Sequence, residues 1–251
     1  MRIDDLMENL PAQTERLSSA REQVDGDIPW YPYNIFGNLV HVDAMLSGVN
    51  RDLTGLAQNL PVADIGAADG DLAFLLEDVG GWDVDIVDTA ATNMNGLRGA
   101  RALRDHLSSK VSVHDIDLDR QFELPRERYG LVFLLGILYH LQNPYYMMRE
   151  LATRSDYCLL STKVARFAGA QRTPIADLPI GYLVAPRETN NDPTNYWIFS
   201  PAGVERLVER TGWRILERAN VGNTTGSDPA TSENDERMFM LLQSTSAPAP
   251  T

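Results

Sequence analysis

The stretch PVADIGAADGDLAFLLEDVGGWDVDIVD, residues 61–88, decides the fold class of this chain. A short apolar run ends in a glycine turn. A segment opened by Asp and closed by Gly-Gly has the marks of a helix, and a second apolar run ends in Asp88. The same alternation continues through KVSVHDID, YGLVFLLGILYHL, NPYYMMRELATR and DYCLLSTKV. Strands and helices that alternate in this way predict a doubly wound α/β domain, with a mostly parallel sheet and helices on both faces.

The segments on either side complete the predicted organisation. Residues 1–58 combine apolar positions at helical spacing, interrupted by Pro11, with the aromatic stretch IPWYPYNIFGNL, and predict a helical and aromatic cap. Residues 59–244 form the predicted main domain. Within it, residues 165–200 break the alternation after the fifth strand and indicate a functional insert. Residues 245–251 predict a disordered tail.

Acidic residues follow three of the predicted strands, where an open α/β sheet binds its ligands. They are Asp64 in the first glycine turn, Asp88 after the second strand and Asp115 after the third. A nicotinamide cofactor calls for G-x-G-x-x-G, but counting from Gly66 the other two glycine places hold Ala68 and Asp71. Carboxylates in this turn would repel a pyrophosphate but not a sulfonium or an ammonium group. The charges therefore favour S-adenosylmethionine (SAM) over a dinucleotide.

Four motifs resemble those of class I, Rossmann-like SAM-dependent methyltransferases: ADIGAADG (63–70), DIVD (85–88), HDID (114–117) and LLGILYHLQNP (134–144). The resemblance covers residues 60–165 and extends to NYWIFSPAGVERLVERTGW (195–213). It implies SAM as cofactor, S-adenosylhomocysteine (SAH) as product, and a seventh, antiparallel strand supplied by ERMFMLLQS (236–244). It also implies that Gly66 and Gly70 line the methionine end, that Asp88 binds ribose, that Asp115 and Ile116 bind adenine, and that Gly136 lies beneath the cofactor. The full predicted cofactor-binding set is Asp64, Gly66, Ala67, Gly70, Asp88, Thr89, Asp115, Ile116, Leu135 and Gly136.

The predicted function is methyl transfer to O, N or C of a small molecule, either a metabolite or a natural product. The segment ILYHLQNP is also similar to wobble-uridine tRNA carboxymethyl-transferring enzymes. A tRNA-modifying methyl- or carboxymethyltransferase is therefore one alternative, and a SAM-binding protein without catalysis is another. The net charge of −13 and the pI near 4.7 disfavour nucleic acid as a partner.

Further candidates have two interpretations each. His140 is a general base or a structural histidine. Trp30, Tyr31 and Tyr33 form a lid over the substrate or only bury their rings, and Asn195 and Trp197 in the insert have the same alternatives. No histidine or cysteine cluster predicts a metal. No apolar run reaches the roughly 18 residues of a membrane span. We expect a cytoplasmic monomer or homodimer whose partner is its small-molecule substrate.

Overall fold

The computed structural model describes residues 1–230 and 232–246. In this part of the chain the main sheet has the strand order β10-β11-β5-β4-β1-β2-β3. The strands are β1 (Val62–Ile65), β2 (Val84–Asp88), β3 (Ser112–Asp115), β4 (Tyr129–Leu135), β5 (Ser155–Val164), β10 (Trp213–Gly222) and β11 (Glu236–Ser244). β1 pairs in parallel with β2 and β4, and β2 pairs in parallel with β3. The predicted α/β class with a mostly parallel sheet is confirmed, and β11 is the predicted antiparallel seventh strand, paired with β10.

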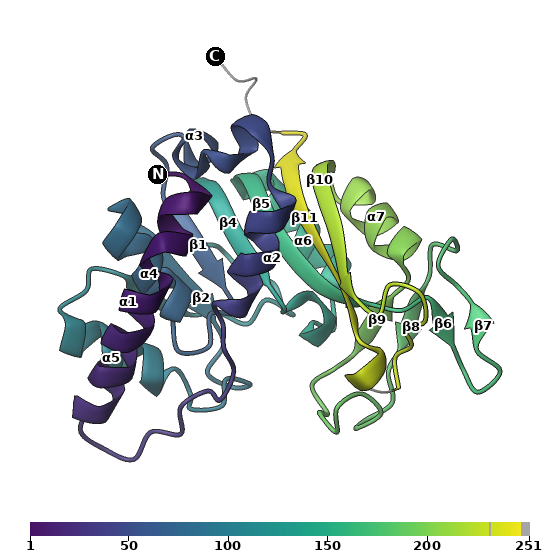
Figure 1. Cartoon of the computed structure of the whole chain (residues 1–251), viewed down its shortest axis with the longest axis horizontal. Helices are drawn as coiled ribbons and strands as arrows, with labels where there is room; N and C mark the ends of the chain where they lie inside the picture. Colours follow the sequence, from purple (N-terminus) through teal and green to yellow (C-terminus); the bar gives the residue numbers. More distant parts are fainter. Residues whose placement is uncertain (231, 247–251) are drawn as a thin grey trace. The chain divides into compact units, whose positions relative to one another are not determined.

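The chain divides into two compact units. The first comprises Met1–Phe133 and Arg154–Tyr157, and the second comprises Leu134–Thr153 and the chain from Cys158 onward. Helices of the first unit are α1 (Ile3–Gln23), α2 (Gly37–Met45), α3 (Leu53–Ala57), α4 (Asp71–Gly80) and α5 (Arg98–Leu107), with a 3₁₀ turn η1 (Gly48–Arg51). α1 packs against α2, α4 and α5 (Figure 1). The division into a cap (1–58) and a main domain (59–244) stays a prediction.

Two helices of the first unit differ from the sequence prediction. Pro11 lies inside one continuous helix, α1, instead of interrupting it. Because Pro11 is exposed, the carbonyl oxygen that loses its helical donor there can bind water instead. The sequence of residues 92–107 predicts a helix over its whole length, but α5 begins only at Arg98. The Asn93 Oδ1 atom accepts hydrogen bonds from the backbone amides of Asn95 and Leu97, and such a side-chain turn competes with the helix.

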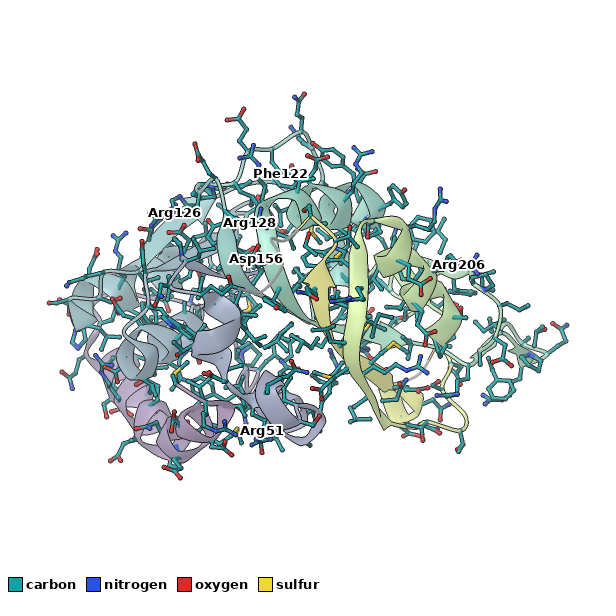
Figure 2. All side chains as sticks on the ribbon, turned by 90° about the horizontal axis from the view of Figure 1, so that it is seen from above. Arg51, Phe122, Arg126, Arg128, Asp156 and Arg206 are labelled. Atoms are coloured by element: carbon teal, nitrogen blue, oxygen red, sulfur yellow. The ribbon has the colours of Figure 1, made fainter. Side chains whose placement is uncertain are left out.

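Ion pairs hold the beginning of β4 in the first unit. The guanidinium group of Arg128 binds the buried carboxylate of Asp156, with Nε 2.6 Å from Oδ1, and the two side chains lie together in Figure 2. Arg126 binds Asp85 through Nε at 2.9 Å. Because Asp85 is fully buried, its charge depends on this partner.

The second unit contains η2 (Leu138–His140), most of α6 (Pro144–Arg154), α7 (Pro201–Arg210) and η3 (Ser232–Asn234). α7 begins with the Ser200 side chain accepting a hydrogen bond from the amide of Gly203 and with Pro201 at the first helical position. The insert is less irregular than predicted, because it forms the short strands β6 (Phe167–Ala168), β7 (Thr173–Pro174), β8 (Gly181–Leu183) and β9 (Trp197–Phe199). These surround a small core of Ala165, Ile175, Val184 and Ile198.

Of the predicted disordered tail, residues 247–251 lie outside the described residues. No helix in the described part of the chain is both long and apolar enough to cross a bilayer.

Candidate functional site

The loop after β1 places three alternate residues in the left-handed region. They are Gly66 (φ 71°), Ala68 (φ 55°) and Gly70 (φ 85°). Ala68 adopts this conformation at a cost of about 1–2 kcal/mol. Gly70 also has no room for a side chain, because a Cβ atom there would lie 2.6 Å from Ile86 Cδ1. The loop therefore presents backbone at the end of the strand, which is the geometry that a closely approaching ligand needs.

Asp64, in β1, has a buried carboxyl group, one oxygen of which accepts no hydrogen bond from the described residues. Burial raises the pKa of Asp64 to about 8, and the charge of Asp88 adds to this, whereas the backbone amide of Ala73 opposes it. The Asp64 Oδ2 atom is buried and has no hydrogen-bond partner among the described residues. A buried acceptor without a donor costs about 1–3 kcal/mol. A ligand that brought a donor to this oxygen would therefore be stabilised.

Asp88, at the end of β2, already accepts three hydrogen bonds. Its Oδ1 accepts from the Thr89 amide at 2.7 Å, and its Oδ2 accepts from the Ala68 amide at 3.2 Å and from Asn93 Nδ2 at 3.0 Å. Burial raises the pKa of Asp88, and these donors oppose the shift. A carboxylate offers about four acceptor positions. One acceptor position on Oδ1 thus remains for a ribose hydroxyl. If both ribose hydroxyls bind Asp88, one of its three present donors must move away.

The remaining predicted adenine residues tie neighbouring strand ends together. Asp115 is exposed, and its Oδ1 accepts from the amide of Ala90 at 2.9 Å. The amide of Ile116 donates to the carbonyl oxygen of Asp88 at 2.9 Å. The ends of β2 and β3 are therefore linked, and the adenine contact itself stays a prediction.

Residues 29–31 lie against the loops of this site. The amide of Tyr31 donates to Asp69 Oδ2 at 2.8 Å, and the Tyr31 Oη atom accepts from the amide of Met94 at 2.8 Å. Asn95 Nδ2 donates to Asp69 Oδ1 at 2.7 Å and to the carbonyl of Pro29 at 3.2 Å. The buried carboxylate of Asp69 is therefore engaged within the protein, which leaves Asp64 as the unfilled acid of the first loop.

The other two aromatic residues of the cap differ from each other. Trp30 lies under the guanidinium group of Arg21, 5.5 Å from the ring centroid, and Arg21 forms an ion pair with Asp71 at the start of α4. Tyr33 is 70% exposed. Trp30 and Tyr31 thus pack on the first unit while Tyr33 projects from it, and the opening of this segment as a lid stays a prediction.

In the second unit, Gly136 and His140 follow β4. Gly136 has φ 85°, and its amide donates to the carbonyl of Ser161 at 3.0 Å. Leu135 before it is half-buried. The His140 Nδ1 atom lies 2.9 Å from Thr194 Oγ1 and 3.1 Å from the Thr194 carbonyl oxygen.

The contacts of Thr194 assign the tautomer of His140. The Thr194 hydroxyl donates to Asp192 Oδ1 at 2.7 Å, so its proton is not directed at the imidazole. His140 Nδ1 must therefore carry the proton that it shares with Thr194, which leaves the lone pair on Nε2. Burial lowers the pKa of His140, although the charge of Asp192 opposes the shift. The ring is therefore neutral at pH 7, with a basic nitrogen available.

Asn195 and Trp197 hold the insert together. The buried Asn195 donates through Nδ2 to the carbonyl of Thr189 at 3.0 Å, while its Oδ1 has no partner among the described residues. Trp197 Nε1 donates to the carbonyl of Gln142 at 3.3 Å. Their contact with a substrate stays a prediction.

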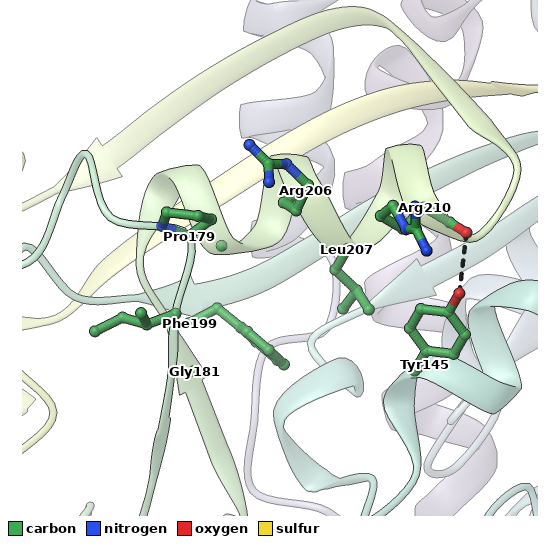
Figure 3. Close-up of a pocket in the computed structure, with 9 residues that line it drawn as sticks. Tyr145, Pro179, Gly181, Phe199, Arg206, Leu207 and Arg210 are labelled. Atoms are coloured by element: carbon green, nitrogen blue, oxygen red, sulfur yellow. Dashed lines mark hydrogen bonds between the residues drawn. The ribbon is translucent and has the colours of Figure 1, made fainter.

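A separate shallow depression lies on the second unit, and none of the predicted site residues lines it. Apolar residues of the insert and of α7 line it together with Arg206 and Arg210, and Tyr145 donates a hydrogen bond to the carbonyl of Arg210 at 3.2 Å across one end (Figure 3). No group of three or more His, Cys, Asp or Glu side chains that could hold a metal ion occurs among the described residues.

Comparison of the structure with solved structures identifies the fold. The N-terminal domain of EvdMO1, solved with SAH bound, matches 92% of this chain and 97% of its own with a TM-score of 0.58 and 14% identity. A SAM-dependent methyltransferase from Mesorhizobium loti matches 82% of this chain and 97% of its own, with a TM-score of 0.55 and 13% identity. The chain has the fold of SAM-dependent methyltransferases.

This methyltransferase fold does not fix the reaction. The [4+2]-cyclase SpnF matches 96% of both chains with a TM-score of 0.56 and 9% identity. No protein-family model matches the sequence. A search of curated proteins gives no match either.

The sequence analysis did not identify four residues that bear on the candidate site. Asn93 and Asn95 organise the loop after β2, and their only signal is two amides in the segment TNMN. Lys163 and Arg237 carry charge at the end of β5 and the start of β11. A cation inside an otherwise apolar strand pattern, as in LLSTKV and ERMFML, is the signal that would have found them.

Proposed function

We propose that the chain is a SAM-dependent methyltransferase that transfers a methyl group to O, N or C of a small molecule. The observation that carries the proposal is the unfilled, buried Oδ2 of Asp64 beside a loop that exposes its backbone. A cofactor with an ammonium group would donate to this oxygen. The free acceptor position on Asp88 Oδ1 suits a ribose hydroxyl. A pyrophosphate cofactor would instead bring negative charge to a buried acid.

The residues of the second unit supply the proposed proton chemistry. SAM, when bound, supplies a methyl group on a positively charged sulfur atom. His140 Nε2 accepts the proton that an O–H or N–H acceptor loses as the new bond to the methyl carbon forms. Thr194 and Asp192 hold the imidazole in the tautomer that this step requires. A positioned base of this kind contributes roughly 10²–10⁴-fold to a rate, and orientation of the two reactants contributes further.

The charges of the insert support a small molecule over a nucleic acid. Arg166 binds the buried Glu236 through two hydrogen bonds of 2.8 and 2.7 Å. Arg172 is paired with Asp228 at 2.9 Å. The insert contains three arginines that could bind RNA phosphates. Arg166 and Arg172 are neutralised within the protein, and of the three only Arg187 has no carboxylate partner among the described residues.

Methyl transfer from labelled SAM tests this proposal directly. Purified protein is incubated with labelled SAM and either a panel of metabolites or total tRNA, and wild type is compared with His140→Gln. Label transferred to a small molecule, and reduced at least about 100-fold by the substitution, supports the proposal. Transfer to tRNA alone contradicts the proposed acceptor class. Binding of SAM without transfer to either class contradicts the proposed catalysis.

A further inference from the structure

Two cations lie close to the buried ring of Tyr139 in the second unit. The guanidinium carbon of Arg237 lies 5.7 Å from the ring centroid, and Arg237 Nη2 donates to the Tyr139 Oη atom at 3.4 Å. The ammonium nitrogen of Lys163 lies 5.9 Å from the same centroid. A Cβ atom on Gly136 would lie 3.5 Å from Arg237 Nη1 and 3.7 Å from Tyr139 Oη. The guanidinium group and the hydroxyl therefore both lie beside the turn that follows β4.

Arg237 lacks the counter-charge that its surroundings lead one to expect. The chain has 35 acidic and 22 basic residues, so carboxylates are in excess. Arg237 is half-buried and yet has no carboxylate within ion-pair distance in the described part of the chain. The other described arginines without such a carboxylate are all exposed: Arg98, Arg101, Arg154, Arg187, Arg206, Arg210 and Arg214. Partial burial without a counter-charge is costly, which favours a ligand as the partner.

The buried ammonium group of Lys163 has N–H donors that the described residues do not fully use. Its side chain is only 4% exposed. The Nζ atom forms an ion pair with Asp235 Oδ2 at 2.8 Å, and it has no other hydrogen-bond acceptor among the described residues. Burial lowers the pKa of Lys163, and Asp235 opposes the shift. An ammonium group has three N–H donors, so this one can still bind an incoming acceptor.

We propose that Arg237 and Lys163 bind an oxyanion group of the methyl acceptor, a carboxylate or a phosphate, beside Gly136 and Tyr139. The planar fork of arginine matches both anions, and charge-assisted hydrogen bonds are the strong ones. The Tyr139 ring lies 4.3 Å from the ring of His140, so the bound anion lies one aromatic ring away from the proposed base. This inference rests on the proposed function, and it narrows the acceptor to an anionic small molecule.

Binding of benzoate and benzamide, probes that differ in charge but little in shape, tests the inference. Both are titrated by NMR into wild type, Arg237→Gln, Arg237→Lys and Arg101→Gln. Arg101 is an exposed arginine on α5 of the first unit, so its substitution makes the same charge change elsewhere.

We expect wild type to bind benzoate and to bind benzamide at least about tenfold more weakly. Arg237→Gln should weaken benzoate binding by a similar factor, Arg237→Lys by less because the charge stays, and Arg101→Gln should have no effect. The lysine variant keeps the test valid if the glutamine variant fails to fold. Equal affinity for the two probes, or benzoate binding that is unchanged in the Arg237 variants, overturns the inference.

A second arm separates the acceptor from the carboxylate of the cofactor itself. SAH and 5′-methylthioadenosine, which lacks the amino-acid part, are titrated into wild type and Arg237→Gln. We expect the substitution to leave both affinities unchanged. Weaker SAH binding with unchanged methylthioadenosine binding would assign Arg237 to the cofactor and overturn the inference. If wild type binds neither nucleoside, the proposed function fails, while the benzoate titration still decides whether the anion site exists.

Discussion

Replacement of Gly70 by alanine should destabilise the first unit by about 2–5 kcal/mol. A residue with a side chain at φ 85° costs about 1–2 kcal/mol. The new Cβ atom would also lie 2.6 Å from Ile86 Cδ1 and 3.1 Å from Phe74 Cε2, both fully buried, and such overpacking costs about 1–3 kcal/mol. The sum is a large part of the roughly 5–15 kcal/mol that holds a typical domain folded.

Two other glycines separate these contributions. Gly81 has φ 63° but nothing within 4 Å of an added Cβ, so Gly81→Ala should cost only the backbone strain, about 1–2 kcal/mol. Gly37 has open space and no positive φ, so Gly37→Ala should be neutral or stabilise by up to about 1 kcal/mol.

Urea unfolding followed by circular dichroism measures the series. Ile86→Val removes the clashing Cδ1 and costs about 0.5–1.5 kcal/mol alone. The double variant Gly70→Ala/Ile86→Val should therefore lose less stability than the sum of the two single variants. If Gly70→Ala costs no more than Gly81→Ala, or if the double variant is simply additive, the argument about space in this loop is wrong.

Three further predictions concern the acids and the base. Because the pKa of Asp64 is raised to about 8, the folded state keeps a proton that the unfolded state loses near pH 4, so the free energy of unfolding should fall between about pH 4 and 8. Asp64→Asn should make this fall smaller when urea unfolding is compared at about pH 5 and about pH 8. A pH dependence equal to that of wild type would contradict the prediction. His140 has a lowered pKa, so the single-turnover rate should rise with pH and reach half of its plateau value below pH 6.5. Thr194→Val should slow this rate about tenfold. A rate that falls with rising pH would count against His140 as the base. Asn93→Ala should lower the unfolding free energy by about 1–3 kcal/mol, since it removes a donor to Asp88, and no change would show that the bond is unimportant.

Periodicity and strand-end chemistry were sufficient to predict the fold. The run from Val62 to Asp88 contains a buried strand, a helix with left-handed glycines at both ends, and a second buried strand. Each of these elements is determined by local sequence, so the pattern could be read without the structure. The start of α5 could not, because Asn93 stops the helix through side-chain bonds to the backbone that no periodicity reveals.

The candidate site could be predicted only in part. Asp64, Asp88 and Asp115 follow strands, and topology alone brings strand ends to one edge of a sheet. The engagement of Asp69 by Tyr31 joins residues 38 positions apart, and the contact of Arg237 with Tyr139 joins residues 98 positions apart. Such contacts depend on tertiary packing, which the sequence pattern does not contain.

Calorimetric titration of the purified protein with SAH tests the central claim most directly, with Asp88→Ala and Asp105→Ala measured beside wild type. Asp105 is an exposed carboxylate on α5 of the same unit and controls for the loss of one negative charge. The account predicts a dissociation constant on the order of micromolar for wild type and Asp105→Ala, weakened at least about tenfold in Asp88→Ala. No binding of SAH by the wild type, or equal binding by Asp88→Ala, would contradict it.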